Sequence, residues 1–242
     1  MAHFRSNGFT IIETSLVLAI TGLLVAMILL GIGSSLSHQR YTDAVNQSIA
    51  FFRSQYSQTT NVLNDREKTD ALAASSCGAT ASEGQTPGSS DCLLLGNVLR
   101  SSDGKTVTTY QVIGRHDPSS DNGVAAKTDA QILTSALLQQ GNQTGTYSLE
   151  WGSTLLNATT SDPAKFSMMV LRVPVSGTVV TYTSSSDTTS VSSLLGLAQA
   201  DMKLCVDQAG FFSIGIPPMG VLVKQSASNT SGVQPISSGD CA

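Results

Sequence analysis

Residues 9–36 of the chain read FTIIETSLVLAITGLLVAMILLGIGSSL, and Glu13 is the only charged residue among them. About 20 apolar residues cross the hydrocarbon core of a bilayer as a helix, so this stretch predicts a membrane-spanning helix. The preceding segment, MAHFRSNG, is short and polar, and no A-x-A cleavage site follows the apolar run, unlike in an ordinary secretory signal peptide. Arg5 and the acidic remainder of the chain predict that the N-terminus is cytoplasmic and the C-terminus outside.

The position of Glu13 within this run is its most informative feature. A carboxylate inside a membrane span costs roughly 2.5–3.5 kcal/mol on insertion scales, so such residues usually have a partner and a role. The alternative is a glutamate near the cytoplasmic end of the span that reaches to the lipid headgroups. Glu13 stands in the context Gly8-Phe9-Thr10-Ile11-Ile12-Glu13.

Gly8, Phe9 and Glu13, followed by a long apolar helix, resemble the N-terminus of the type IV pilin superfamily, which includes pilins and the pseudopilins of type II secretion. The resemblance covers residues 1–36 closely and the rest of the chain only in layout. It implies that a prepilin peptidase cuts between Gly8 and Phe9 and that the new Phe9 amino group is N-methylated. It also implies that Glu13 pairs with the Phe9 amine of a neighbouring subunit. Such a pair would favour one axial register between neighbouring helices, because an unpaired charge in an apolar bundle is energetically unfavourable.

The N-terminal segment also departs from the pilin pattern. The leader lacks the Lys/Arg cluster of many prepilins. The span has no proline, and Leu30 stands where many major pilins carry one. Gly31 and Gly33 could soften the helix there, since a glycine costs about 1 kcal/mol relative to alanine in a helix. Gly22 falls where many pilins also have a glycine.

Residues 37–64 predict an amphipathic continuation of the same helix. Apolar positions alternate spacings of four and three and form one stripe, namely Val45, Ile49, Phe52, Tyr56, Thr59 and Leu63. Polar residues lie mainly off it, namely Arg40, Asp43, Gln47, Arg53 and Gln55. We expect the stripe to pack on a sheet of the same subunit, with a coiled-coil seam to another chain as the alternative.

The remainder predicts an α+β, pilin-like fold in which the long helix covers an antiparallel sheet. Residues 65–91 form an expected connector loop, and 92–242 the globular domain. Strands at 92–99 and 105–113 flank Asp103-Gly104, a strong hairpin signal. A short helix is expected at 129–140, the segment 184–200 is a loop or a short helix, and the polar tail 225–242 should fray if left free. Further strands are expected at 146–151, 166–174, 178–183, 203–207, 211–216 and 219–224.

The chain has four cysteines, and their even number in an exported body suggests disulfides. Short loops close most readily, which favours Cys77–Cys92 and Cys205–Cys241 among the three possible pairings. Four free buried thiols are the alternative. The pilin resemblance also implies a disulfide-bounded C-terminal loop.

Composition indicates no enzyme and no cofactor. The three histidines, His3, His38 and His116, lie far apart, no C-x-x-C pair suggests zinc, and no catalytic motif such as G-x-S-x-G occurs. A net charge of −4 without any basic run argues against nucleic acid as a specific ligand.

The predicted function is that of a filament subunit. It would lie in the cytoplasmic membrane before assembly and in a cell-surface pilus afterwards. Its partners would be identical subunits, minor pilins, the prepilin peptidase and the assembly platform of the membrane. A minor pilin or pseudopilin that primes or tips a filament is the alternative. A single-pass membrane protein with an exported ligand-binding domain is a third hypothesis.

Overall fold

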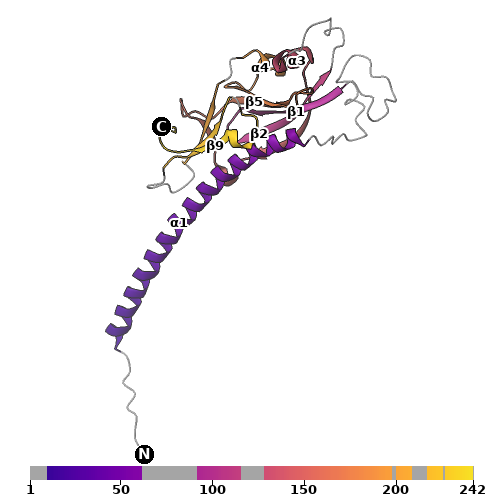
Figure 1. Cartoon of the computed structure of the whole chain (residues 1–242). Coiled ribbons are helices and arrows are strands. Elements are labelled where there is room, and N and C mark those ends of the chain that lie inside the picture. The colour runs from indigo at the N-terminus through magenta and orange to yellow at the C-terminus, as the bar shows by residue number, and fades with distance from the viewer. Residues whose placement is uncertain are drawn as a thin grey trace, which may run out of the picture.

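The computed structural model describes residues 10–61, 92–115, 128–197, 200–208, 217–225 and 227–241. It is an α+β structure with a long helix, α1 (Ile11–Thr60), and two antiparallel sheets. The first half of α1 stands clear of the body and the second half lies against it (Figure 1). Thr10 caps the helix, since its Oγ1 accepts a hydrogen bond from the Glu13 N–H at 3.3 Å. The helix runs unbroken through Gly31 and Gly33, so the expected softening produces no interruption.

The larger sheet has five strands in the order β3-β2-β1-β5-β6, and the smaller has four in the order β4-β7-β8-β9. The five strands of the larger sheet are β1 (Cys92–Ser101), β2 (Thr106–Arg115), β3 (Gln139–Ser148), β5 (Phe166–Arg172) and β6 (Val179–Ser184). The four of the smaller are β4 (Leu155–Asn157), β7 (Met202–Val206), β8 (Gly220–Val223) and β9 (Val233–Ile236). Short helical segments complete the body, namely α3 (Asp129–Ser135), η2 (Glu150–Gly152), α4 (Val191–Leu195) and η3 (Thr230–Gly232).

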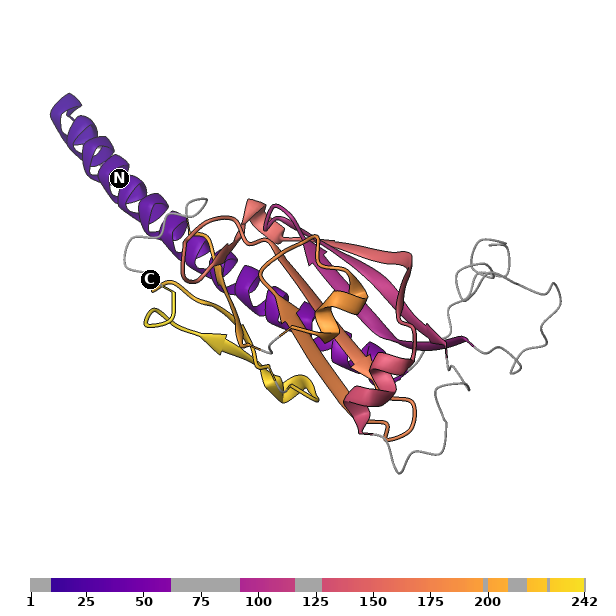
Figure 2. The same cartoon turned by 90° about the horizontal axis from the view of Figure 1, so that it is seen from above.

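The centre of the larger sheet is buried on both faces. Along β5, Met168 and Val170 belong to a core shared with α1 and the smaller sheet. Met169 and Leu171 belong to a second core with α3 and α4. Successive strand residues point to opposite faces, which explains why FSMMVLR is apolar throughout its centre. In Figure 2 the C-terminal strands lie alongside the second half of α1.

The predicted stripe on α1 and its packing on the subunit's own sheets are confirmed. Val45, Ile49, Phe52, Tyr56 and Thr59 are all buried, and all of these except Thr59 are part of the core shared with the sheets. Leu63 lies outside the described residues. Gln55 was expected off the stripe but is buried, because its Oε1 accepts a hydrogen bond from Asn97 Nδ2 of β1 at 3.2 Å.

The predicted hairpin at Asp103-Gly104 is confirmed as the β1–β2 turn. Asp103 Oδ1 accepts hydrogen bonds from the backbone N–H groups of Lys105 and Thr106, both at 2.9 Å. The bond from Thr106 is the main cause that lowers the pKa of the Asp103 carboxyl. Gly104 has φ +68, and a Cβ there would clash with the Leu155 carbonyl. Glycine is therefore required at this turn.

The predicted helix at 129–140 is only half right. A capping box at Thr128 starts α3, but the helix ends at Ser135 and Leu137 adopts φ +44. Gln139 and Gln140 then pair with β2 and begin β3, because the open edge of the sheet satisfies their backbone groups.

Other sequence predictions differ in extent. The strand expected at 146–151 ends at Ser148, since Trp151 and Gly152 both have positive φ. The strands expected at 166–174, 178–183, 203–207 and 219–224 are found within two residues of their bounds, whereas 211–216 lies outside the described residues. The segment 184–200 contains the short helix α4. The tail contains β9, which the polar composition of 225–242 did not predict.

Candidate functional site

The first half of α1 is the candidate site, because its apolar side chains have no partner within the described part of the chain. Ile11 is 87% exposed, Leu18 71% and Leu24 51%. Within the described residues, α1 is the one helix long and apolar enough to cross a membrane. Such exposure is stable only in an apolar surrounding, either lipid or other helices.

Glu13 is the only charged side chain among residues 11–36. The hydroxyls of Thr14, Ser15 and Thr21 all donate to backbone carbonyls of their own helix, for example Thr21 Oγ1 to Val17 O at 2.8 Å. The Glu13 carboxylate has no hydrogen-bond or ion-pair partner among the residues that the structure describes. It lies in the first turn, where the helix dipole favours negative charge. The carboxylate is therefore available to a cation from outside the described residues.

The predicted processing site falls outside the described residues. Gly8 and Phe9, and with them the proposed cleavage and N-methylation, are not placed by the structure. Gly22 and Gly33 in the exposed half have no atom within 4 Å of an added Cβ, so a second helix can approach closely there.

Tyr41 marks the junction between the exposed and the packed half. It is the first fully buried side chain of α1, and its hydroxyl accepts a hydrogen bond from the Met219 N–H at 2.7 Å. Farther along, both Arg53 Nε and Nη2 donate to the Val233 carbonyl, at 3.2 and 2.9 Å. These contacts fix α1 on the smaller sheet. Sequence reasoning missed Tyr41 because it precedes the apolar stripe.

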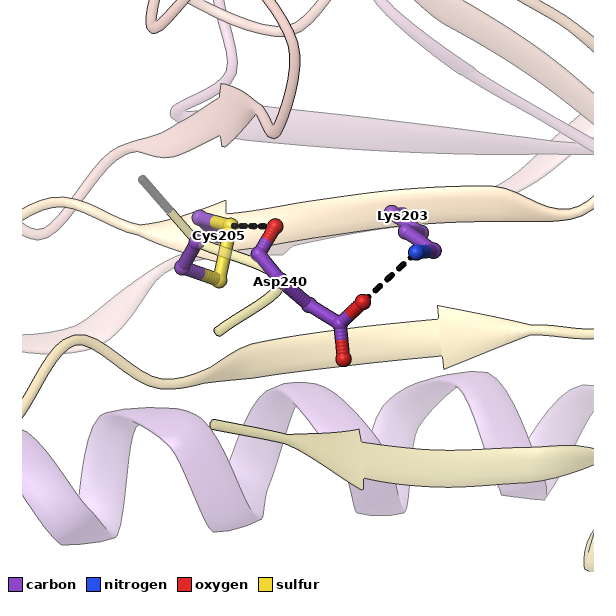
Figure 3. A network of polar contacts seen from close by, with 4 residues as sticks. Lys203, Cys205 and Asp240 are labelled. Carbon is purple, nitrogen blue, oxygen red and sulfur yellow. Dashed lines mark hydrogen bonds and ion pairs between the residues drawn. A yellow bond between two sulfur atoms is a disulfide. The ribbon is translucent and has the colours of Figure 1, made fainter. Parts of the chain in front are cut away.

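The C-terminal disulfide Cys205–Cys241 is confirmed, with its Cα atoms 5.7 Å apart. It ties the end of the chain to β7 (Figure 3). Lys203 Nζ and Asp240 Oδ1, 2.6 Å apart, form an ion pair beside it (Figure 3). The alternative of free thiols is therefore wrong for these two residues. Cys77 lies outside the described residues, and so does the predicted Cys77–Cys92 bridge.

A cavity of about 470 Å³ lies between the end of α1 and strands β1–β3. Its lining is uncharged and includes Gln55, Asn97 and Thr109. Phe51 and Tyr147 form a stacked pair at one wall, with ring centroids 4.3 Å apart. In the described ranges no group of three or more His, Cys, Asp or Glu could hold a metal ion. The cavity suits a neutral polar ligand better than a charged one.

Comparisons with protein-family models, with curated proteins and with solved structures found no match for this chain. The long apolar helix, the sheets and the C-terminal disulfide are compatible with a pilin-like fold.

Proposed function

We propose that the chain is a subunit of an extracellular filament of the type IV pilin kind. The first half of α1 holds it in the membrane before assembly and packs into the filament core afterwards. The observation that carries the proposal is Glu13, a carboxylate with no described partner on a helix face that is otherwise apolar and exposed.

The charge of Glu13 limits how the first half of α1 can pack. A carboxylate buried in an apolar bundle without a cation is strongly unfavourable, whereas a paired one is tolerated and fixes the register. After cleavage behind Gly8, the new amine of Phe9 on a neighbouring subunit would supply such a cation. Gly22 and Gly33 support close helix approach.

The test uses surface filaments sheared from cells that express the full chain. Mass spectrometry is expected to find an N-terminal methylated Phe9. Glu13→Leu is expected to insert and to be cleaved, but to give at least tenfold fewer filaments. Thr21→Val is the matched control, since Thr21 bonds only to its own helix. Normal filament yield from Glu13→Leu, or a chain that keeps Met1–Gly8, would refute the proposal.

The same experiment separates the alternatives. A major subunit would dominate the sheared material, whereas a minor pilin or pseudopilin would form a small fraction of it. Identical subunits, minor pilins, the prepilin peptidase and the assembly platform are the partners under this proposal. An exported ligand-binding domain is the second candidate, favoured by the uncharged cavity beside Asn97. It predicts an uncut chain that stays in the membrane.

A further inference from the structure

The turn η2 displays a tryptophan at the end of the body where α1 emerges. Trp151 is the single tryptophan of the chain and is 51% exposed. It has φ +57, a left-handed conformation that is unfavourable for a bulky residue. Its neighbours Leu149 and Ser153 are both buried, so the turn is held from both sides while its tip faces outward.

Two contacts fix this turn against α1. The guanidinium carbon of Arg40 lies 4.9 Å from the centroid of the Trp151 ring, a cation–π arrangement. Gln47 Nε2 donates to Glu150 Oε2 at 3.0 Å. The exposed ring is therefore held against α1 rather than free to rotate away.

The position of this pair along α1 matches a membrane surface. Arg40 follows the last apolar residue of the exposed half, Leu36, by four residues, which is about 6 Å of helix. The headgroup layer on each side of the hydrocarbon core is roughly 5–7 Å thick. Tryptophan and arginine are both favoured at that level, the indole by its amphipathic ring and the guanidinium by lipid phosphates.

Helix length adds a second argument. The stretch from Glu13 to Leu36 rises about 35 Å, which exceeds the hydrocarbon thickness of about 30 Å. A span longer than the core tilts, and tilting lowers one side of an attached body toward the surface. We infer that Trp151 and Arg40 form a membrane-interface anchor, which docks the η2 side of the body on lipid headgroups before assembly. This inference rests on the membrane anchorage in the proposed function.

The single tryptophan provides the test. The full chain is reconstituted in vesicles of phosphatidylethanolamine and phosphatidylglycerol, with lipids brominated either near the glycerol or near the chain end. Trp151 emission is expected to be blue-shifted and quenched at least twofold more by bromines near the glycerol. The control is Trp151→Phe combined with Val175→Trp. Val175 is 79% exposed on the turn after β5, whose Arg172 contacts Thr60 at the far end of α1. Its tryptophan should be neither shifted nor quenched.

A second pair of variants tests the arginine. Arg40→Gln is expected to reduce quenching of Trp151, whereas Arg172→Gln, at the far end of α1, should leave it unchanged. If the chain is inserted in the vesicles and its Trp151 emission equals that of the Val175→Trp control, the interface anchor is refuted while the proposed membrane anchorage stands. An emission shift that requires high protein density and shows no bromine quenching would assign the ring to a second copy, and would also refute the interface anchor. A chain that fails to float with vesicles would instead refute the anchorage itself.

Discussion

The two halves of α1 share one continuous helix but have opposite surroundings. In residues 11–36 the large apolar side chains whose exposure is described are at least 45% exposed. From Tyr41 to Thr59 the corresponding stripe is buried, with Tyr41 and Phe52 fully so. The second half is stabilised by tertiary packing, as most helices in folded proteins are. The first half has no such packing against any part of the chain that the structure describes.

This difference bears on the proposed assembly of a filament. The core of the body is completed by the second half of α1, so the body does not need the first half in order to fold. Under the proposed function, the first half could exchange lipid for neighbouring helices without unfolding, since its backbone and the hydroxyls of Ser15 and Thr21 hydrogen-bond within the helix. Under the proposed function, such a subunit would move from membrane to filament without a change in its body.

The largest effect is expected from core truncation in the packed half. Phe52→Ala should lower the free energy of unfolding of the body by roughly 3–5 kcal/mol, because a fully buried phenylalanine leaves a cavity. Leu24→Ala, in the exposed half, should leave body stability within about 0.5 kcal/mol of wild type. Urea unfolding of the full chain in detergent, followed by near-UV circular dichroism, measures both. Equal losses would mean that the two halves are not energetically separate.

Removal of the C-terminal disulfide should cause the second-largest loss in the free energy of unfolding. Cys205→Ser with Cys241→Ser is expected to cost the body about 2–4 kcal/mol in the chain-entropy account of a bridge across 36 positions. Residues 225–241 should become sensitive to protease, while flotation with vesicles through α1 stays unchanged. Reduction of the wild-type chain serves as the control and should give the same protease pattern. A tail equally resistant in all forms would contradict the role of the bridge.

Sequence patterns predicted the features that depend on local chemistry. The apolar run, the 3–4 spacing from Val45 to Thr59, the Asp103-Gly104 turn and the Cys205–Cys241 pair all follow from short-range rules. The first seven residues of β3, QQGNQTG, escaped prediction because they have no apolar alternation and are held by the edge of β2. The division into two sheets depends on pairings such as Cys205 with Leu156, between residues 49 apart, that no local signal specifies.

Tyr41 tests the junction of the two halves. Tyr41→Phe should cost about 1–3 kcal/mol, because the Met219 N–H then loses its partner in a poorly solvated position. Hydrogen exchange of the Met219 amide is expected to accelerate, while exchange in residues 11–36 should not change. The control Tyr110→Phe removes a half-buried hydroxyl on β2, away from the junction. A protected Met219 amide in Tyr41→Phe would show that the junction is held by other contacts.

The last prediction concerns Tyr56, whose titration has no effect on stability at neutral pH. The Thr181 hydroxyl donates to the Ala227 carbonyl at 2.6 Å, so Tyr56 must donate its own proton to Thr181. Burial raises the pKa of Tyr56 to about 12 from its ordinary 10.0. The neutral Tyr56 hydroxyl is favoured in the folded state, so its contribution to the free energy of unfolding is fully present below pH 10. That stability is lost as the pH rises from 10 toward 12, because the unfolded state releases the proton first.

The measurement is urea unfolding of the full chain between pH 9 and pH 12. This range covers the ordinary pKa of tyrosine, 10.0, and the pKa of about 12 for Tyr56 in the folded protein. Tyr56→Phe should make the decline shallower than in wild type. Burial also raises the pKa of Tyr147 and Tyr182, so a residual decline is expected in the variant. A decline unchanged by Tyr56→Phe would assign the alkaline sensitivity to those two residues. In every case the exposed half of α1, which has no tyrosine in residues 11–36, should keep its helix, and that contrast separates the two halves by pH alone.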